Sequence, residues 1–203
     1  MTTLKWYRVA NYLLPAVLFV TIAFGTATYA SDVVLSNEYI QVTVNARSEN
    51  TGRFAIKTTG GDPDRVSDDN TYLIYQLEDA KGPWTSFTTL AIDGVPWVYG
   101  GRTRDSAGLG GQTGTAVMLP RLVEGRRIDS AWQMGPIQAS QTISFVRSST
   151  TGLMDTARIC YELWNNDSEP HAVGVRITLD TMLGDNDGAP FRVGERALTT
   201  DTM

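Results

Sequence analysis

Three aspartates near the C-terminal end have the residue type and spacing that best fit metal binding. Asp180, Asp185 and Asp187 lie close together, with Asn186 between the last two. Ca²⁺ prefers six to eight oxygen ligands from carboxylates and carbonyls. We therefore predict a calcium site at the three aspartates, and residues 62–69 offer a second acidic loop. The alternative is a polar turn in which Asp and Asn side chains bind their own backbone.

Tryptophans form the second group of candidate binding residues. We predict that Trp84, Trp97 and Trp132 bind a ligand, because flat aromatic faces stack on the C–H surfaces of sugars. Trp84 is the strongest of the three, since it follows Gly82-Pro83 in a predicted loop. The alternative for each is a place in the hydrophobic core, which is the commoner role of tryptophan.

Nucleophilic catalysis finds little support in the sequence. His171 is the only histidine, and it follows Pro170 in a predicted turn with no serine motif beside it. We predict a solvent-exposed turn histidine and no catalytic residue. A glycoside-active enzyme with paired carboxylates stays an alternative, because the spacing of two carboxylates depends on the fold.

Composition limits the partners and the covalent links of the chain. Its 203 residues include 17 Lys and Arg against 22 Asp and Glu, which gives a net charge of −5. Nucleic-acid binding needs clustered basic residues, so this balance predicts no nucleic-acid partner. Cys160 is the only cysteine and can form no intramolecular disulfide. If the sheet is covered on both sides, we predict that Cys160 is a small buried side chain, with a reactive thiol as the alternative.

The first thirty residues have the layout of a secretory signal peptide. Lys5 and Arg8 precede an apolar run at residues 12–25, and small residues follow as far as Ala30. This layout predicts a cleaved signal helix at residues 1–30 and an exported domain at residues 31–203. That domain would be secreted, periplasmic or at the cell surface, with no membrane span after cleavage. An uncleaved anchor is the alternative.

The elements that must position these residues have the period of β-strands. Val173, Val175, Ile177 and Leu179 alternate with other residues, which predicts a half-buried strand. A similar run at residues 156–164 precedes a polar turn, so we predict an antiparallel hairpin in the middle of a sheet.

The same alternation recurs after residue 30 in ten to twelve short segments, without helical periodicity. This predicts an all-β fold, an antiparallel β-sandwich, with a larger supersandwich as the alternative. No closing strand is evident after Thr200, so we expect a fragment of a longer protein.

Three motifs carry a family resemblance. They are WNNDSEPHAVGVRITLDTMLGDNDGAPF, TTGGDPDRVSDDN and PWTSFTT. With them the chain resembles an uncharacterised group of secreted bacterial β-sandwich proteins. Its layout is also similar to galactose mutarotase-like sandwich domains, which implies a carbohydrate ligand. That family uses histidines and a glutamate in catalysis, and this chain has one histidine, so the resemblance implies no catalytic residue here.

These observations lead to one expected function and two alternatives. We expect an exported β-sandwich module of the cell envelope that binds carbohydrate or another envelope component. The first alternative is a structural or assembly subunit of the cell surface that depends on calcium. The second is the glycoside-active enzyme described above.

Overall fold

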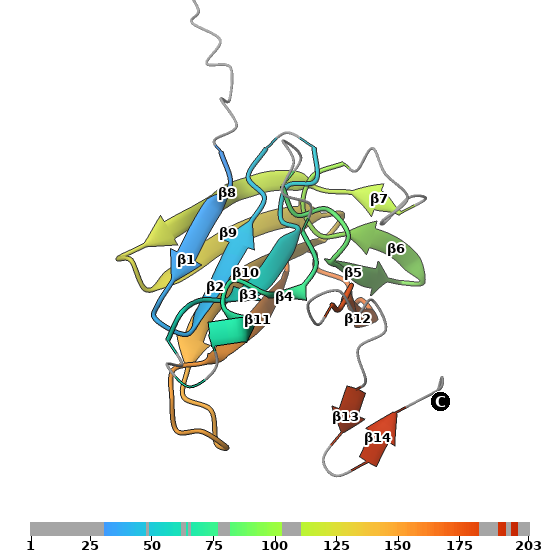
Figure 1. The fold of residues 1–203 in the computed structure, drawn as a ribbon. Helices are drawn as coiled ribbons and strands as arrows, with labels where there is room; N and C mark the ends of the chain where they lie inside the picture. The colour runs from blue at the N-terminus through green and yellow to red at the C-terminus, as the bar shows by residue number, and fades with distance from the viewer. Residues whose placement is uncertain are drawn as a thin grey trace, which may run out of the picture.

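The structure is all-β, as the alternation predicts (Figure 1). This computed structural model describes residues 31–47, 49–61, 64, 66–76, 82–102, 111–182, 191–193 and 196–198. The predicted signal peptide, residues 1–30, lies outside this part of the chain. Within the described part, helical structure is limited to one 3-10 turn, Val66–Asp68. No helix there is long and apolar enough to cross a membrane.

The first four strands form one antiparallel sheet in chain order. They are β1 (Val33–Ser36), β2 (Ile40–Val44), β3 (Phe54–Thr58) and β4 (Tyr72–Ile74). Val42 and Val44 are fully buried, because the alternation of β2 turns these apolar residues to one face.

A second sheet holds the longest strands, in the order β11-β10-β9-β8. They are β8 (Thr115–Val123), β9 (Arg127–Met134), β10 (Ile137–Val146) and β11 (Thr156–Asn165). In β10 every second residue from Ile137 to Ile143 is buried. That strict period of two gives the sheet one inward face and one outward face.

The third sheet has the order β12-β5-β6-β7. Its strands are β5 (Phe87–Ile92), β6 (Val95–Val98), β7 (Gln112–Thr113) and β12 (Val173–Thr178). Asp93 and Gly94 join β5 to β6 with φ angles of 50° and 80°. Positive φ at both positions is what a two-residue hairpin turn requires, and an Asp-Gly dipeptide accepts it. A separate pair, β13 (Phe191–Val193) and β14 (Arg196–Leu198), completes the described strands.

The long β8–β11 sheet is one layer of the sandwich and packs against both other sheets. One half of its inward face joins a cluster with the first sheet, in which Ile128 and Ile143 meet Val42, Val44 and Phe54. The other half joins a cluster with the third sheet, in which Trp132 and Ala139 meet Leu90, Ile92 and Tyr99. One continuous strand layer therefore serves two core clusters.

The predicted central hairpin at residues 156–180 is wrong. β11 pairs with β10, whereas β12 pairs with β5, so the two strands belong to different sheets. Each lies at the edge of its sheet in the described part of the chain. The polar segment between them is therefore a crossover between the layers. Local alternation identifies a strand, but it does not identify the partner of that strand.

Edge position also changes the burial of β12. Val173 packs against the second cluster, as predicted. Val175 is 50% exposed and Ile177 is 44% exposed, and Leu179 beyond the strand is also exposed. The predicted half-buried face is thus buried at one end only: Val173 packs against the opposing layer, and Val175 and Ile177 stay exposed.

Cys160 is exposed, which corrects the prediction of a buried side chain. It lies in β11 between Ile159 and Tyr161, whose side chains point to the core. The alternation of the strand therefore turns the thiol to the outward face, and that face is uncovered at β11.

Candidate ligand-binding pocket

The segment that carries Trp84 is fixed to the first sheet by its neighbours. Asn45, which is buried, donates its side-chain amide to the carbonyl of Pro83 at 2.9 Å. Gly82 has a φ of 65°, and a Cβ at this position would lie 2.5 Å from a carboxylate oxygen of Asp32. Glycine adopts this backbone conformation without strain and leaves room for the Asp32 carboxylate. The loop before β5 therefore has a defined position.

The segment that carries Asp180 is fixed against the same region. The backbone N–H of Asp180 donates to the hydroxyl of Ser86 at 2.9 Å. The backbone carbonyl of Asp180 accepts from the N–H of Tyr75 at 2.9 Å, and the N–H of Met182 donates to the carbonyl of Leu73 at 3.1 Å. Residues 180–182 thus continue beyond β12 and lie alongside β4.

These two segments and the end of β4 line a partly open cavity of about 380 Å³. Its lining residues are Tyr75, Trp84, Thr85, Asp180 and Met182. The lining residues combine two aromatic rings and a thioether with one carboxylate and two hydroxyls. Such a mixture of apolar surface and a few polar groups is typical of small-molecule sites.

Two polar atoms of the lining residues are buried without a partner. Trp84 Nε1 and Thr85 Oγ1 make no hydrogen bond among the described residues. A buried donor without an acceptor costs free energy, and most such groups in proteins are satisfied by protein or by water.

The predicted binding residues separate into those at the cavity and those elsewhere. Trp84 and Asp180, from two independent predictions, both line it. Asp185 and Asp187 lie outside the described residues, and no group of three or more metal-ligating side chains occurs among the residues described.

The other two tryptophans have packing positions. Trp132 is 2% exposed and its ring lies 5.2 Å from that of Tyr99, so it has no face free for a ligand. Trp97 is partly buried against the same cluster. For Trp132, the core alternative is therefore the one that the structure supports.

Tyr75, Thr85 and Met182 complete the lining and did not stand out in the sequence. Thr85 follows Trp84 in the sequence, but all three residue types are common in any strand or turn. Their contribution depends on the contact between β4 and residues 180–182, which no local pattern contains.

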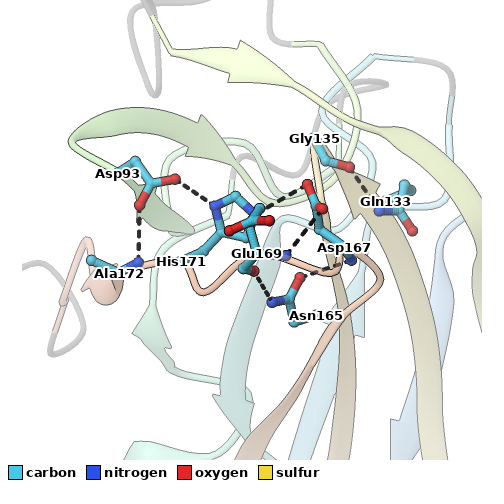
Figure 2. Close-up of polar contacts among 8 residues, drawn as sticks. All are labelled: Asp93, Gln133, Gly135, Asn165, Asp167, Glu169, His171 and Ala172. Atoms are coloured by element: carbon cyan, nitrogen blue, oxygen red, sulfur yellow. Dashed lines mark hydrogen bonds and ion pairs between the residues drawn. The ribbon is translucent and has the colours of Figure 1, made fainter.

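His171 is the centre of a second polar cluster (Figure 2). It precedes β12, whereas Asp180 of the cavity follows the other end of that strand. Its Nδ1 lies 2.6 Å from Asp93 Oδ2 and its Nε2 lies 3.3 Å from Asp167 Oδ2. The side chain is 15% exposed, so the prediction of a freely exposed turn histidine is wrong. The cluster joins the β5–β6 turn to the crossover between β11 and β12.

The electrostatics of this cluster favour a charged imidazole. The hydrogen bond to Asp93 is the largest cause that raises the pKa of His171 above its ordinary value. The same bond, with the N–H of Ala172, lowers the pKa of Asp93. The backbone N–H of Glu169, and then His171, lower the pKa of Asp167. All three groups therefore hold their charges over a wider pH range than usual.

The geometry also limits what this cluster can do. Both ring nitrogens face carboxylates, so neither is free to take a proton from a nucleophile. The two contacts also lie on different sides of the ring, so the three groups do not converge on one metal ion. We interpret the cluster as a structural clamp.

Comparison with known proteins adds no relative to this geometry. No family model matches the chain, and neither a curated protein nor a solved structure shows significant similarity to it. Any assignment of function therefore depends on the cavity and on the sequence.

Proposed function

We propose that this protein is an exported carbohydrate-binding module of the cell envelope, with the sugar in the cavity between Trp84 and Asp180. The observation that carries the proposal is the convergence of these two residues, one predicted to stack on a sugar and one predicted to offer oxygen ligands. Export rests on the signal-peptide layout of residues 1–30.

The lining chemistry supports a polyhydroxylated ligand. The rings of Trp84 and Tyr75 offer apolar surface for C–H groups, and Asp180 offers oxygens that accept hydrogen bonds from hydroxyls. A volume of about 380 Å³ suits a monosaccharide or a disaccharide.

Calcium is part of this proposal as an organiser of the acidic segment. Asp180 would use one carboxylate oxygen for the ion, and Asp185 and Asp187 would supply further oxygens. Binding of sugar would then weaken when a chelator removes the ion.

Calorimetric titration with soluble envelope glycans tests the proposal. At least one glycan should bind wild type, and Trp84→Ala should weaken that binding at least tenfold, which is about 1.4 kcal/mol. Asp180→Asn should weaken it as well. Trp164→Ala is the matched control, because Trp164 is exposed on β11 and is absent from the cavity lining.

The same titration can be run with calcium and with a chelator. The protein for it should be recovered from the envelope, and the mass of that protein should correspond to a chain that begins after Ala30. The absence of binding to every glycan, or equal binding by wild type and Trp84→Ala, would exclude the proposed site.

A structural or assembly role remains the second candidate, and one observation favours it. β11 and β12 both lie at sheet edges and expose apolar residues such as Leu163 and Val175. The self-complementarity of one of these edges leads to a separate inference.

A further inference from the structure

β11 presents a long backbone edge that pairs with no other described strand. It runs for ten residues, Thr156–Asn165, and pairs with β10 without a register shift. In the described part of the chain it is the last strand of its sheet. Natural edge strands are usually shortened or interrupted by lysine, proline or a bulge, which prevents pairing with other chains. β11 has no lysine, proline or bulge, and its two charged residues, Arg158 and Glu162, have opposite signs.

The flank beside β11 is apolar. Leu163 lies on the same face of β11 as Ile159 and Tyr161, which face the core, but Leu163 is 38% exposed. Tyr161 contacts Thr88 of β5 through their hydroxyls at 2.5 Å, and Thr88 is paired with Ile177 of β12. β11 covers Thr88 of β5. Ile177 lies on the next strand, β12, beyond the part of the sheet that β11 covers, and its side chain is exposed. A further strand at this edge would meet apolar surface.

We propose that two copies of this chain associate by antiparallel pairing of their β11 strands, around a two-fold axis at Cys160. The two four-stranded sheets would then form one continuous sheet across the dimer. A two-fold interface uses the same surface on both subunits, so the strand has to be complementary to itself.

The sequence of β11 has this self-complementarity. With Cys160 on the axis, Arg158 lies opposite Glu162 of the second copy, and Glu162 lies opposite Arg158. On the inward face the same register places Ala157 opposite Leu163. Cross-strand pairs of opposite charge stabilise antiparallel pairing and pairs of like charge destabilise it, so this register has two favourable charge pairs.

Charge reversal provides the sharpest test, with sedimentation velocity over a range of protein concentrations. Wild type should form a dimer as concentration rises. Arg158→Glu should place acidic residues opposite each other and weaken association at least tenfold, and Glu162→Arg should do the same with basic residues. The double variant R158E/E162R should restore the dimer, because the charge pairs reappear with exchanged signs.

Arg176→Glu is the matched control, since Arg176 is an exposed arginine on the other edge strand, β12. It should associate like wild type. A protein that stays monomeric at all concentrations would overturn the proposal. So would a dimer that the two single reversals leave unchanged.

Cys160 gives an independent readout of the register. Directly opposed residues in an antiparallel pair have Cβ atoms about 4.5–5.5 Å apart. Diamide, which accepts the two thiol hydrogens, should therefore link the two Cys160 residues into a disulfide dimer in wild type and in R158E/E162R, but much less in R158E. Equal crosslinking in all three would contradict the register. Trp84→Ala should dimerise normally, so failure of the sugar site leaves this test intact.

Discussion

Arg53 shows how one buried residue can organise two loops. It is fully buried, and its guanidinium donates to the carbonyls of Tyr99 at 2.9 Å, Thr51 at 3.3 Å and Gly101 at 3.3 Å. The cation also lies over the ring of Phe87, 5.6 Å from its centroid. Burial lowers the pKa of Arg53 to about 10. Among the described residues, main-chain carbonyls rather than a carboxylate are the hydrogen-bond partners of this charge.

Arg53→Leu should lower the free energy of unfolding by about 2–4 kcal/mol, because carbonyls of both loops would lose buried donors. Urea unfolding measures this difference. Arg127→Ala is the control: Arg127 is exposed and pairs with Asp129 at 2.9 Å, and loss of such a surface pair should cost less than about 1 kcal/mol. Equal effects of the two variants would show that the carbonyl contacts of Arg53 contribute little.

At the scale of elements, the His171 clamp joins the β5–β6 turn to the crossover that follows β11. Because the pKa of His171 is raised in the folded protein, its contribution to stability is complete below pH 6.5. That contribution is lost as the pH rises through the raised pKa. Because the pKa of Asp93 is lowered in the folded protein, its contribution to stability is present above pH 3.8. That contribution is lost as the pH falls through the lowered pKa. The clamp should therefore stabilise most between these two limits.

His171→Gln should lower the melting temperature most within that window and least at alkaline pH, where the wild-type imidazole is neutral. Thermal unfolding followed by circular dichroism at several pH values measures the difference between wild type and variant. A difference that stays constant from acidic to alkaline pH would mean that the charge of His171 does not contribute. Ser168→Ala, in the same polar segment, should show no such pH dependence.

Strands and tight turns were predictable from the sequence, because alternation and the Asp93-Gly94 dipeptide are local signals. The partners of β11 and β12 were not, since local pattern does not specify which edge a strand joins. The site shows the same division. Trp84 and Asp180 each carry a chemical signal, but the contact that joins their segments links Ser86 and Asp180, 94 residues apart.

For the whole molecule, the β8–β11 sheet connects two clusters that would otherwise be separate cores. Ile143 belongs to the cluster with the first sheet, and Trp132 belongs to the cluster with the third. The strands that carry them, β10 and β9, are hydrogen-bonded along eight register positions. Loss of either cluster would therefore expose part of the inward face of β9 and β10. The other cluster is built on the same two strands. This arrangement predicts one cooperative unit rather than two.

Ile143→Ala and Trp132→Ala test this cooperativity, since both side chains are buried and lie in different clusters. Each should lower the free energy of unfolding by about 2–5 kcal/mol, because a cavity replaces packed atoms. Fluorescence and circular dichroism should report one coincident transition in wild type and in both variants. Val117→Ala, at an exposed position of β8, should change stability little. Two separated transitions in either core variant would show that the sheets flanking the β8–β11 layer unfold independently, because each cluster would then be stable without the other.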